Sequence, residues 1–406
     1  MSKKLITMTI GELIKNQKYA VVDGPFGTQL HKSDYVKKGI PLIRVQNISE
    51  SNTFDENNLV FVSEKTFKEL DRSAVYPEDI LFSKTGSVGR VCFLPKKLER
   101  GLLASSCAKI SIDSEKIDPK YVAIFLVSSK GKHQIKNLAV GSTRQTINLT
   151  EIKSIKIPVL DENVQSNIVQ IYSKFQELLI QRKQNLELLD KLLLSYFYEL
   201  FGKSLERFDK VTILKNLILD KPQNGLFKKN NLYGDGTKIV WVENVSKNGI
   251  LKTSDLKRVK LNSDEINKYK LCKNDVIITR SSHLGKSGVG LMNVVQESDE
   301  NVVFESHIMK IKLNTQKINP YFLSVYFNSS LGRARIEQKA TQATMSTINQ
   351  PNLLSLKVPD ISITEQNKFE KFVKQIYSLH VNQPESLDEM KLAQKNTMEY
   401  FFKNVS

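Results

Sequence analysis

The chain has 406 residues, of which 40% are hydrophobic and 25% charged, and its formal net charge is +17 at pH 7. This length accommodates two or more domains with hydrophobic cores, and the positive charge favours a polyanionic partner such as nucleic acid, although a merely basic surface is an alternative. No stretch approaches the ~20 apolar residues of a membrane span, no signal peptide opens the chain, and three cysteines without metal-ligand spacing fit a reducing cytoplasm.

The first part of the chain contains a polar loop that is a candidate nucleic-acid contact. Residues 7–15 predict a short strand that leads into a turn and a helix, residues 21–35 predict a glycine-containing loop, and residues 41–48 predict a strand. Donors and acceptors suited to phosphates and base edges lie on this loop and strand, at Thr28, Gln29, His31, Lys32, Arg44 and Gln46. A polar surface turn explains the loop residues equally well.

A second candidate contact is the turn within residues 79–91, which predict a strand, a turn and a strand. Lys84, Thr85 and Ser87 make this turn small and basic, so its backbone N–H groups could hold a phosphate. The turn does not match the P-loop pattern GxxxxGK[ST].

The sheet-rich part is expected to end at another strand, residues 104–112, before an apolar helix at residues 119–129 and a basic turn. Arg144 and Gln145 then precede a strand-like segment, residues 146–159, and are further candidate contacts. Each half of the chain therefore predicts a mixed α/β globule of roughly 150 residues.

A long amphipathic helix is predicted for residues 165–201, because apolar residues recur at helical spacing and no proline or glycine interrupts them. Such a helix is about 55 Å long at 1.5 Å per residue, which exceeds a typical globular helix, although one core helix of an ordinary domain is the alternative. Its apolar stripe is expected to bind a partner helix. The stripe residues predicted to do so are Ile168, Phe175, Leu179, Leu186 and Leu193.

The chain repeats itself at an offset near 201 residues. Five separate blocks recur in the same order, which indicates a tandem duplication with short insertions in loops. The matched pairs are residues 40–48 with 237–245, 77–89 with 273–285, 117–129 with 318–330, 146–159 with 347–360, and the helix at 165–201 with 366–402.

The second half keeps the framework but changes the polar residues on the corresponding loops. This pattern is expected if the two modules read two different sequences. Simple sequence drift on a structural repeat would also produce it. Gly285, Lys286 and Ser287 resemble a P-loop ending, but Arg280 stands where its first glycine should be. The candidate contacts of this half are Gln223, Asn224, Lys228, Trp241, Glu243, Arg280, Ser281, His283, Lys286, Thr344 and Ser346.

The C-terminal helical segment is interrupted, because Pro384 must kink or break it near residue 381. Its predicted partner-binding residues are Phe369, Ile376 and Leu387. We expect it to pack antiparallel against the helix at residues 165–201 and to hold the two modules about one DNA turn (~34–36 Å) apart.

The sequence as a whole resembles the specificity subunit of type I restriction–modification systems. The resemblance rests on DGPFGTQL followed by PLIRVQNI, on DILFSKTGSVG, and on the lead-ins TIN…IKIPV and TIN…LKVPD before glutamine-rich helices; Pro384 is a departure. It implies a mixed α/β protein with two tandem target recognition domains, each a small mixed sheet with helices, joined by two long antiparallel coiled-coil helices in an internal pseudo-two-fold repeat. The expected boundaries are a first recognition domain at residues 1–160, a central helix at 161–202, a second recognition domain at 203–361 and a C-terminal helical spacer at 362–406.

The resemblance also implies the partners of the chain. Each recognition domain reads one half of a split site in double-stranded DNA, and the helices bind two copies of the modification subunit. That subunit methylates adenine with S-adenosylmethionine, and restriction subunits that use ATP and Mg²⁺ join the complex. We expect no cofactor on this chain itself.

The residues favour a non-catalytic role and no metal site. A methyltransferase motif [ND]PP[YF] is incomplete at Asn319-Pro320-Tyr321 and at Asp118-Pro119-Lys120, and a helix cap followed by proline explains both. A coiled-coil scaffold without DNA affinity and a stand-alone DNA-binding regulator are the alternatives to a specificity subunit.

Overall fold

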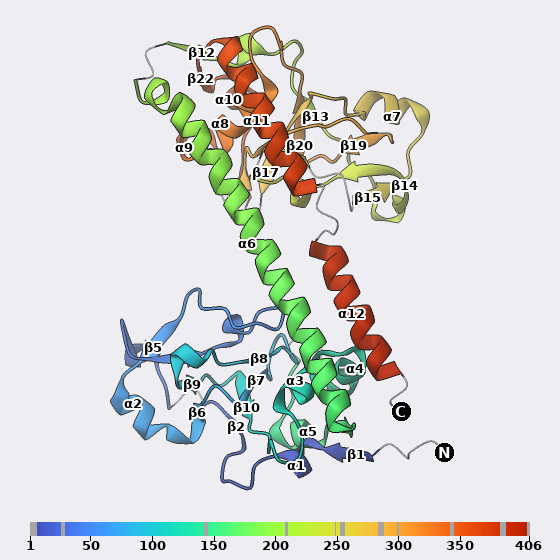
Figure 1. The fold of residues 1–406 in the computed structure, drawn as a ribbon. Coiled ribbons are helices and arrows are strands. Elements are labelled where there is room, and N and C mark those ends of the chain that lie inside the picture. Colours follow the sequence, from blue (N-terminus) through green and yellow to red (C-terminus); the bar gives the residue numbers. More distant parts are fainter. Residues whose placement is uncertain are drawn as a thin grey trace. The chain divides into compact units, whose positions relative to one another are not determined.

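A computed structural model describes residues 6–25, 29–141, 145–207, 210–247, 249–251, 256–282, 288–298, 300–341, 345–381 and 387–403 (Figure 1). The chain divides into two compact units. Unit 1 comprises Met1–Arg182 together with Glu385–Ser406, and unit 2 comprises Lys183–Pro384. Each unit is described by itself below.

Unit 1 is built on three sheets. A four-stranded antiparallel sheet has the order β2-β10-β7-β8, a five-stranded sheet has the order β3-β5-β4-β9-β6 with β4 parallel to β9, and β1 pairs with β11. The strands are β1 (Ile6–Thr9), β2 (Val21–Asp23), β3 (Tyr35–Val36), β4 (Ile40–Ile43), β5 (Val60–Val62), β6 (Ala74–Val75), β7 (Ile80–Ser83), β8 (Val91–Phe93), β9 (Gly101–Leu103), β10 (Cys107–Ile110) and β11 (Lys156–Val159). The helices of the unit are α1 (Ile10–Leu13), η1 (Lys32–Asp34), η2 (Val45–Asn47), α2 (Glu64–Glu69), η3 (Asp71–Ser73), η4 (Lys96–Leu98), α3 (Pro119–Val127), α4 (Ser129–Leu138), α5 (Leu149–Ser154), the first part of α6 (Glu162–Arg207) and α12 (Leu387–Lys403).

Unit 2 repeats this plan. Its four-stranded sheet has the order β13-β20-β16-β18, β14 lies between β15 and β19 and is parallel to β19, and β12 pairs with β22. The strands are β12 (Val211–Ile213), β13 (Gln223–Asn224), β14 (Tyr233–Val240), β15 (Lys257–Val259), β16 (Val276–Thr279), β17 (Ser281–Ser282), β18 (Met292–Val294), β19 (Val302–Phe304), β20 (Ile308–Ile311), β21 (Ser346–Thr347) and β22 (Lys357–Pro359). The helices are the last part of α6, η5 (Leu214–Leu217), η6 (Asn230–Leu232), η7 (Val242–Asn244), α7 (Ser263–Tyr269), α8 (Pro320–Asn328), α9 (Ser330–Lys339), α10 (Gln350–Leu354) and α11 (Ile363–Val381).

The buried helix of each unit begins and ends for local reasons. The side chain of Asp118 caps α3 by accepting from the backbone N–H of Lys120 at 2.7 Å, and Pro119 occupies the first turn, where its missing N–H costs nothing. Gly131 lets α4 fold back on α3, because a Cβ at this position would lie 2.1 Å from the carbonyl oxygen of Phe125. Gly332 makes the same approach to the carbonyl oxygen of Tyr326 in unit 2.

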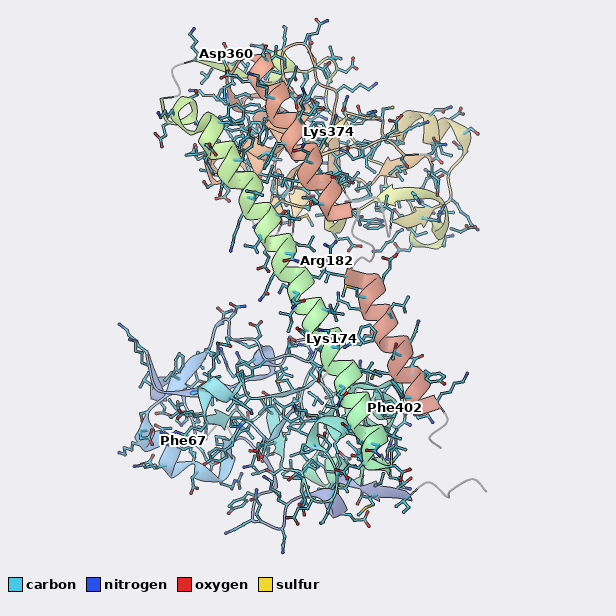
Figure 2. The ribbon with its side chains drawn as sticks, viewed as in Figure 1. Phe67, Lys174, Arg182, Asp360, Lys374 and Phe402 are labelled. Carbon is cyan, nitrogen blue, oxygen red and sulfur yellow. The ribbon has the colours of Figure 1, made fainter. Side chains whose placement is uncertain are left out.

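The long helical segments complete the cores of the two units. In unit 1, Ile168 near the start of α6 and Phe402 at the end of α12 share one core cluster. Figure 2 labels Phe402 on α12. In unit 2, Phe201 near the end of α6 packs on Phe369 near the start of α11, with 5.5 Å between ring centroids. The predicted long helix is confirmed and extends beyond residues 165–201, because α6 covers 46 residues, or about 69 Å.

The internal repeat is confirmed by matching hydrogen bonds. Gln165 accepts from the backbone N–H of Asp118 at 3.2 Å and donates to the carbonyl of Leu160 at 2.7 Å. Gln366 makes the same two bonds, with the backbone N–H of Asn319 at 2.9 Å and the carbonyl of Ile361 at 2.7 Å.

One alignment of the repeat is corrected. Gly89 donates to the carbonyl of Ser83, and in unit 2 the residue that donates in the same way, to the carbonyl of Thr279, is Gly290. Both glycines have positive φ, +87° and +71°. The sequence match of Gly89 with Gly285 was therefore wrong, since the turn after β16 contains an insertion.

Three secondary-structure predictions are also corrected. The strand predicted for residues 41–48 ends at Ile43, and the helical turn η2 follows, with Asn47 fully buried to cap it. The basic turn predicted after residue 129 is the helix α4. The strand-like segment at residues 146–159 contains the helix α5 before β11, because Asn148 and Glu151 form a capping box.

Candidate nucleic-acid interface

The first polar loop of unit 1 is ordered by a capped turn. His31 and Lys32 are exposed at the start of η1, and the backbone N–H of His31 donates to Oδ2 of Asp34 at 2.6 Å. Gln29 is exposed directly before them. Thr28 lies outside the described residues, so the loop offers one amide, one imidazole and one ammonium group to a ligand.

Arg44 and Gln46, the candidates on the segment after this loop, lie at the start of η2 and within it. One of them is exposed and the other is bonded within the protein. Gln46 is exposed, and its amide is available to a base edge. Arg44 is half-buried, and its guanidinium donates to the carbonyl oxygen of Asn58. Arg44 therefore stabilises the loop, and only part of its donor set faces solvent.

The turn between β7 and β8 is tied to the segment after α4. Gly86 donates its backbone N–H to the carbonyl of Gln145 at 3.0 Å, and the Thr85 and Thr146 hydroxyls lie 2.7 Å apart. Ser87 and Gln145 are both exposed. The structure thus brings together Thr85 and Thr146, which lie 61 positions apart in the sequence. Arg144 lies outside the described residues.

Lys84 is not a free phosphate ligand in this turn. Its ammonium lies 2.5 Å from Oδ2 of Asp23, its side chain is only 15% exposed, and Arg72 also approaches Asp23 at 3.8 Å. The DNA contact at Lys84 stays a prediction, and its charge already has a partner in Asp23.

A hollow of about 380 Å³ adjoins this turn and contains cations that the sequence interpretation did not select. Arg90 lines it and lies 2.6 Å from Glu50, and Lys132 and Lys136 of α4 line it without an ion-pair partner among the described residues. Gln145 is on the same wall. The four-residue spacing of the two lysines on one helix face was the signal that could have found them.

In unit 2, the residues at the first loop make internal contacts. The Gln223 side chain donates to the carbonyl of Lys268 at 2.7 Å, and Lys228 forms an ion pair with Glu265. Asn224 is exposed, although Gln350 approaches its Oδ1 at 3.5 Å. Of these three, Asn224 is the residue whose polar group is most available.

Trp241 and Glu243 lie at η7 and form a small cluster with Lys257. The Lys257 ammonium sits 4.8 Å from the Trp241 ring centroid and 2.8 Å from the Glu243 carboxylate. The indole N–H of Trp241 is buried and has no hydrogen-bond partner among the described residues. Glu243 is exposed and can accept a hydrogen bond.

The turn after β16 places Arg280 and Ser281 differently. Arg280 is exposed and has no ion pair within the described part of the chain. Ser281 is 6% exposed and its hydroxyl lies 2.5 Å from Nδ1 of His307, while Ser346 is 2% exposed in the paired strand β21. Ser281 and Ser346 therefore hold the turn together, and His307, which is exposed beside Arg280, was missed by the sequence interpretation. His283, Lys286 and Thr344 lie outside the described residues.

The same framework position carries different charge in the two units. Asp23 on β2 neutralises Lys84 after β7, whereas the corresponding residue on β13 is Asn224, and Arg280 after β16 has no carboxylate there. An amide does not compensate a guanidinium. Among the residues that the structure describes, unit 2 therefore has a cation without an ion pair where unit 1 has an ion pair.

The residues predicted to bind a partner helix fall into two groups. Ile168, Leu193, Phe369 and Ile376 are at most 4% exposed and belong to the cores of their own units. In unit 2, Leu193 of α6 shares one core cluster with Phe369 and Ile376 of α11, so these two helices contact each other within the chain. Phe175, Leu179, Leu186 and Leu387 are half-buried. Other apolar residues of the long helices are exposed, at Val164, Ile171, Leu178, Ile180, Leu188, Leu192, Leu200, Leu379 and Leu392.

The incomplete methyltransferase motif has a structural explanation. Asn319 caps α8 by accepting from the backbone N–H groups of Tyr321 and Phe322, and Asp118 caps α3. Among the described residues, no group of three or more histidine, cysteine or acidic side chains could hold a metal ion. None of the helices in the described part is long and apolar enough to cross a membrane.

Comparison with known proteins identifies relatives over most of the chain. The family described as the type I restriction modification DNA specificity domain matches residues 26–189 and 218–389. The StySPI specificity subunit of Salmonella potsdam is 27% identical over 365 residues, covering 84% of this chain and 75% of that protein. The putative MjaX specificity subunit of Methanocaldococcus jannaschii is 25% identical over 394 residues, covering 90% and 87% of the two chains.

A solved structure shares the fold. The S subunit of a type I restriction–modification system from M. genitalium superposes with a TM-score of 0.58 at 15% identity, covering 100% of this chain and 98% of that one. The predicted fold class, two recognition modules of mixed α/β structure with long helices, is confirmed by this match and by the doubled family match.

Proposed function

Because the chain belongs to the type I restriction modification DNA specificity family, we propose that it is the DNA-reading subunit of a restriction–modification complex. Each module reads one half of a bipartite site in double-stranded DNA. The chain itself performs no chemistry.

The proposal rests on one observation: equivalent positions of the two modules, which share one fold, carry side chains of different charge. Asp23 and Lys84 form an ion pair in unit 1, whereas Asn224 and Arg280 occupy these framework positions in unit 2. The exposed amide of Asn224 can pair with the edge of adenine, and the guanidinium of Arg280, which has no ion pair among the described residues, can contact a phosphate. Two modules with one fold and different exposed groups are suited to read two different half-sites.

The contacts divide by role. Lys32, Lys132 and Lys136 in unit 1 and Arg280 in unit 2 supply sequence-independent affinity for phosphates. Gln29, Gln46, Gln145, Asn224 and Glu243 are exposed amides and a carboxylate that suit base edges. The net charge of +17 favours the same partner.

The helices provide the surface for the modification subunits. Val164, Ile171 and Leu178 are exposed at seven-residue spacing on the first part of α6, and Leu192 is 50% exposed on its last part. Exposed apolar stripes of this kind mark contacts with other proteins. The methylation chemistry with S-adenosylmethionine, and the use of ATP and Mg²⁺, belong to the modification and restriction subunits in this proposal.

The test uses the chain co-expressed with the modification subunit of the same source. The complex selects from a random duplex pool at two salt concentrations, and the bound DNA is sequenced. We expect a two-part motif with a fixed gap, in which replacement of residues 203–361 by another family member's module changes one half alone. Binding of the modification subunit with no enriched motif would show a protein scaffold instead, and a tight split site without any partner would show a stand-alone regulator.

A further inference from the structure

Unit 2 contains a second basic site at the end of its four-stranded sheet, away from the turn after β16 that carries Arg280 (the reading turn). A hollow of about 270 Å³ is lined by Lys221, Lys268, Lys270, Lys310 and Lys312, together with Asp220. Lys312 follows β20, whose last residue pairs with Val276 at the start of β16, whereas Arg280 follows the last residue of β16. The hollow and the candidate DNA contact at Arg280 therefore lie at opposite ends of one strand.

The charge in this hollow is not balanced by the protein. Lys310 is buried, donates to the carbonyl of Lys270 at 2.9 Å and lies 3.8 Å from Asp275. The other four lysines are exposed, and none of them has an ion-pair partner within the ranges that the structure describes. Five lysines thus line the hollow against two carboxylates, Asp220 in the lining and Asp275 beside Lys310. Like charges held this close repel one another, so a bound anion would stabilise the fold.

The framework does not require these lysines, as the same region of unit 1 demonstrates. Lys109 and Asp79 form the same buried ion pair there at 3.7 Å, and the turn before the acid is closed by the same bond, from the backbone N–H of Tyr76 to Asp79 and of Cys272 to Asp275. By this register the counterparts of Lys221, Lys270 and Lys312 in unit 1 are Ala20, Ala74 and Ser111. Three of the lysines are thus additions of unit 2 to a site that folds without them.

We propose that this hollow binds a small molecule that carries two or three consecutive phosphate groups. Lysine ammonium groups on flexible stems are point-charge ligands for phosphate. The excess of about three positive charges matches a polyphosphate, and four of the five lysines that line the hollow are exposed to solvent. The proposal concerns a site separate from the reading turn, so it does not depend on the DNA-reading function.

The test measures the binding of inorganic tripolyphosphate to the full chain, in complex with its modification subunit, by calorimetry at fixed ionic strength. The test variant is Lys221→Ala/Lys270→Ala/Lys312→Ser, which installs the residues that unit 1 carries at these positions. The matched control, Lys215→Ala/Lys317→Ala/Lys357→Ser, removes the same charge from exposed lysines of unit 2 outside the hollow. We expect saturable binding at one site per chain, weakened at least tenfold in the test variant and unchanged in the control.

A second readout needs no variant, because the exposed thiol of Cys272 lines the hollow. Tripolyphosphate is expected to slow the alkylation of Cys272 by the uncharged reagent iodoacetamide at constant ionic strength. No saturable binding, or equal weakening in both triple variants, would overturn the proposal. Displacement of tripolyphosphate by duplex DNA, with a smaller salt dependence of DNA binding in the test variant alone, would assign the lysines to the DNA interface and overturn it as well.

Discussion

The ring of Phe402 packs edge-on against the ring of Phe125, with 5.3 Å between centroids, although Phe125 lies in the first third of the chain and Phe402 lies in its last helix. Phe402 also lies 6.0 Å from Tyr121, and this contact reproduces the one between Phe201 and Phe322 in unit 2, at 5.0 Å. In each unit, the end of a long helical segment therefore covers the buried helix of a recognition module. The helix that follows the first module in sequence completes the second, and the last helix of the chain completes the first.

The first prediction concerns this closure of unit 1. Phe402→Ala removes a ring that is 1% exposed and is expected to destabilise unit 1 by about 3–5 kcal/mol, because the site of a buried phenylalanine collapses only in part. Tyr400→Ala is the control on the same helix, since Tyr400 is 74% exposed, and its effect is expected to stay within about 0.5 kcal/mol. Urea unfolding, with hydrogen exchange of the α3 amides, measures both. Equal stability of the two variants would mean that α12 does not complete the core.

The second prediction concerns the buried glutamines at the starts of α6 and α11. Gln165 and Gln366 each accept from the backbone N–H of a helix cap and donate to a carbonyl. Replacing either by alanine leaves these groups without partners and is expected to cost about 1–3 kcal/mol. Gln170→Ala, at an exposed position of α6, should be close to neutral in the same unfolding measurement. A neutral Gln366→Ala would contradict the role assigned to the pair.

The third prediction concerns pH and Glu305, which is 3% exposed. Its Oε2 accepts from the backbone N–H of His307 at 2.9 Å, whereas its Oε1 has no partner within the described part of the chain. Burial raises the pKa of this carboxyl, against the opposing effects of the His307 N–H and charge. Protonation therefore stabilises the fold below the unfolded-state pKa, and this stability is lost as pH rises through the higher folded-state pKa.

Glu305→Gln keeps the side chain neutral, so its stability relative to the natural protein should increase as pH rises through this window. Thermal unfolding at a series of pH values measures the difference. Glu297→Gln is a control of opposite sign, because the hydrogen bond and charge of Lys273 lower the pKa of the exposed Glu297 carboxyl. If the difference in unfolding stability between Glu305→Gln and the natural protein did not change with pH, the raised pKa of Glu305 would be contradicted.

The fourth prediction concerns thiol reactivity. Burial raises the pKa of Cys92, and it raises that of Cys107 to about 12, whereas Cys272 is exposed. Since the thiolate is the reactive form, a disulfide reagent should modify Cys272 alone in the folded protein and all three cysteines after unfolding. Rapid modification of two thiols in the folded state would show that the core around β8 and β10 opens.

The fifth prediction separates two cations at one framework position. Arg280→Ala should leave stability unchanged and reduce the salt dependence of DNA binding by about one phosphate contact, since Arg280 is exposed and unpaired among the described residues. Lys84→Ala leaves the carboxylate of Asp23, which is 7% exposed, without its closest cation, so it should lower stability instead. Binding at several salt concentrations and unfolding of each variant measure the contrast. The opposite assignment of effects would refute the comparison of the two modules.

The sequence by itself determined the repeat, the long helix and the fold class. These features are local or periodic: the stripe of α6 follows from apolar spacing, and the caps at Asp118 and Asn319 follow from single residues. Gln46, which the sequence predicted to face outward, is exposed, whereas Arg44 beside it is half-buried.

The tertiary structure alone decided which polar residues are free and which helix completes which module. Lys84 forms an ion pair with Asp23, and Ile168 and Phe402 lie in one core cluster. In both cases the residues that meet are far apart in the sequence. An ion pair or a core contact depends on the distance between atoms in space, and residue type and periodicity do not contain that distance. The same reason explains why the lysine hollow of unit 2 could not be found from its sequence, because its five cations come from three separate segments.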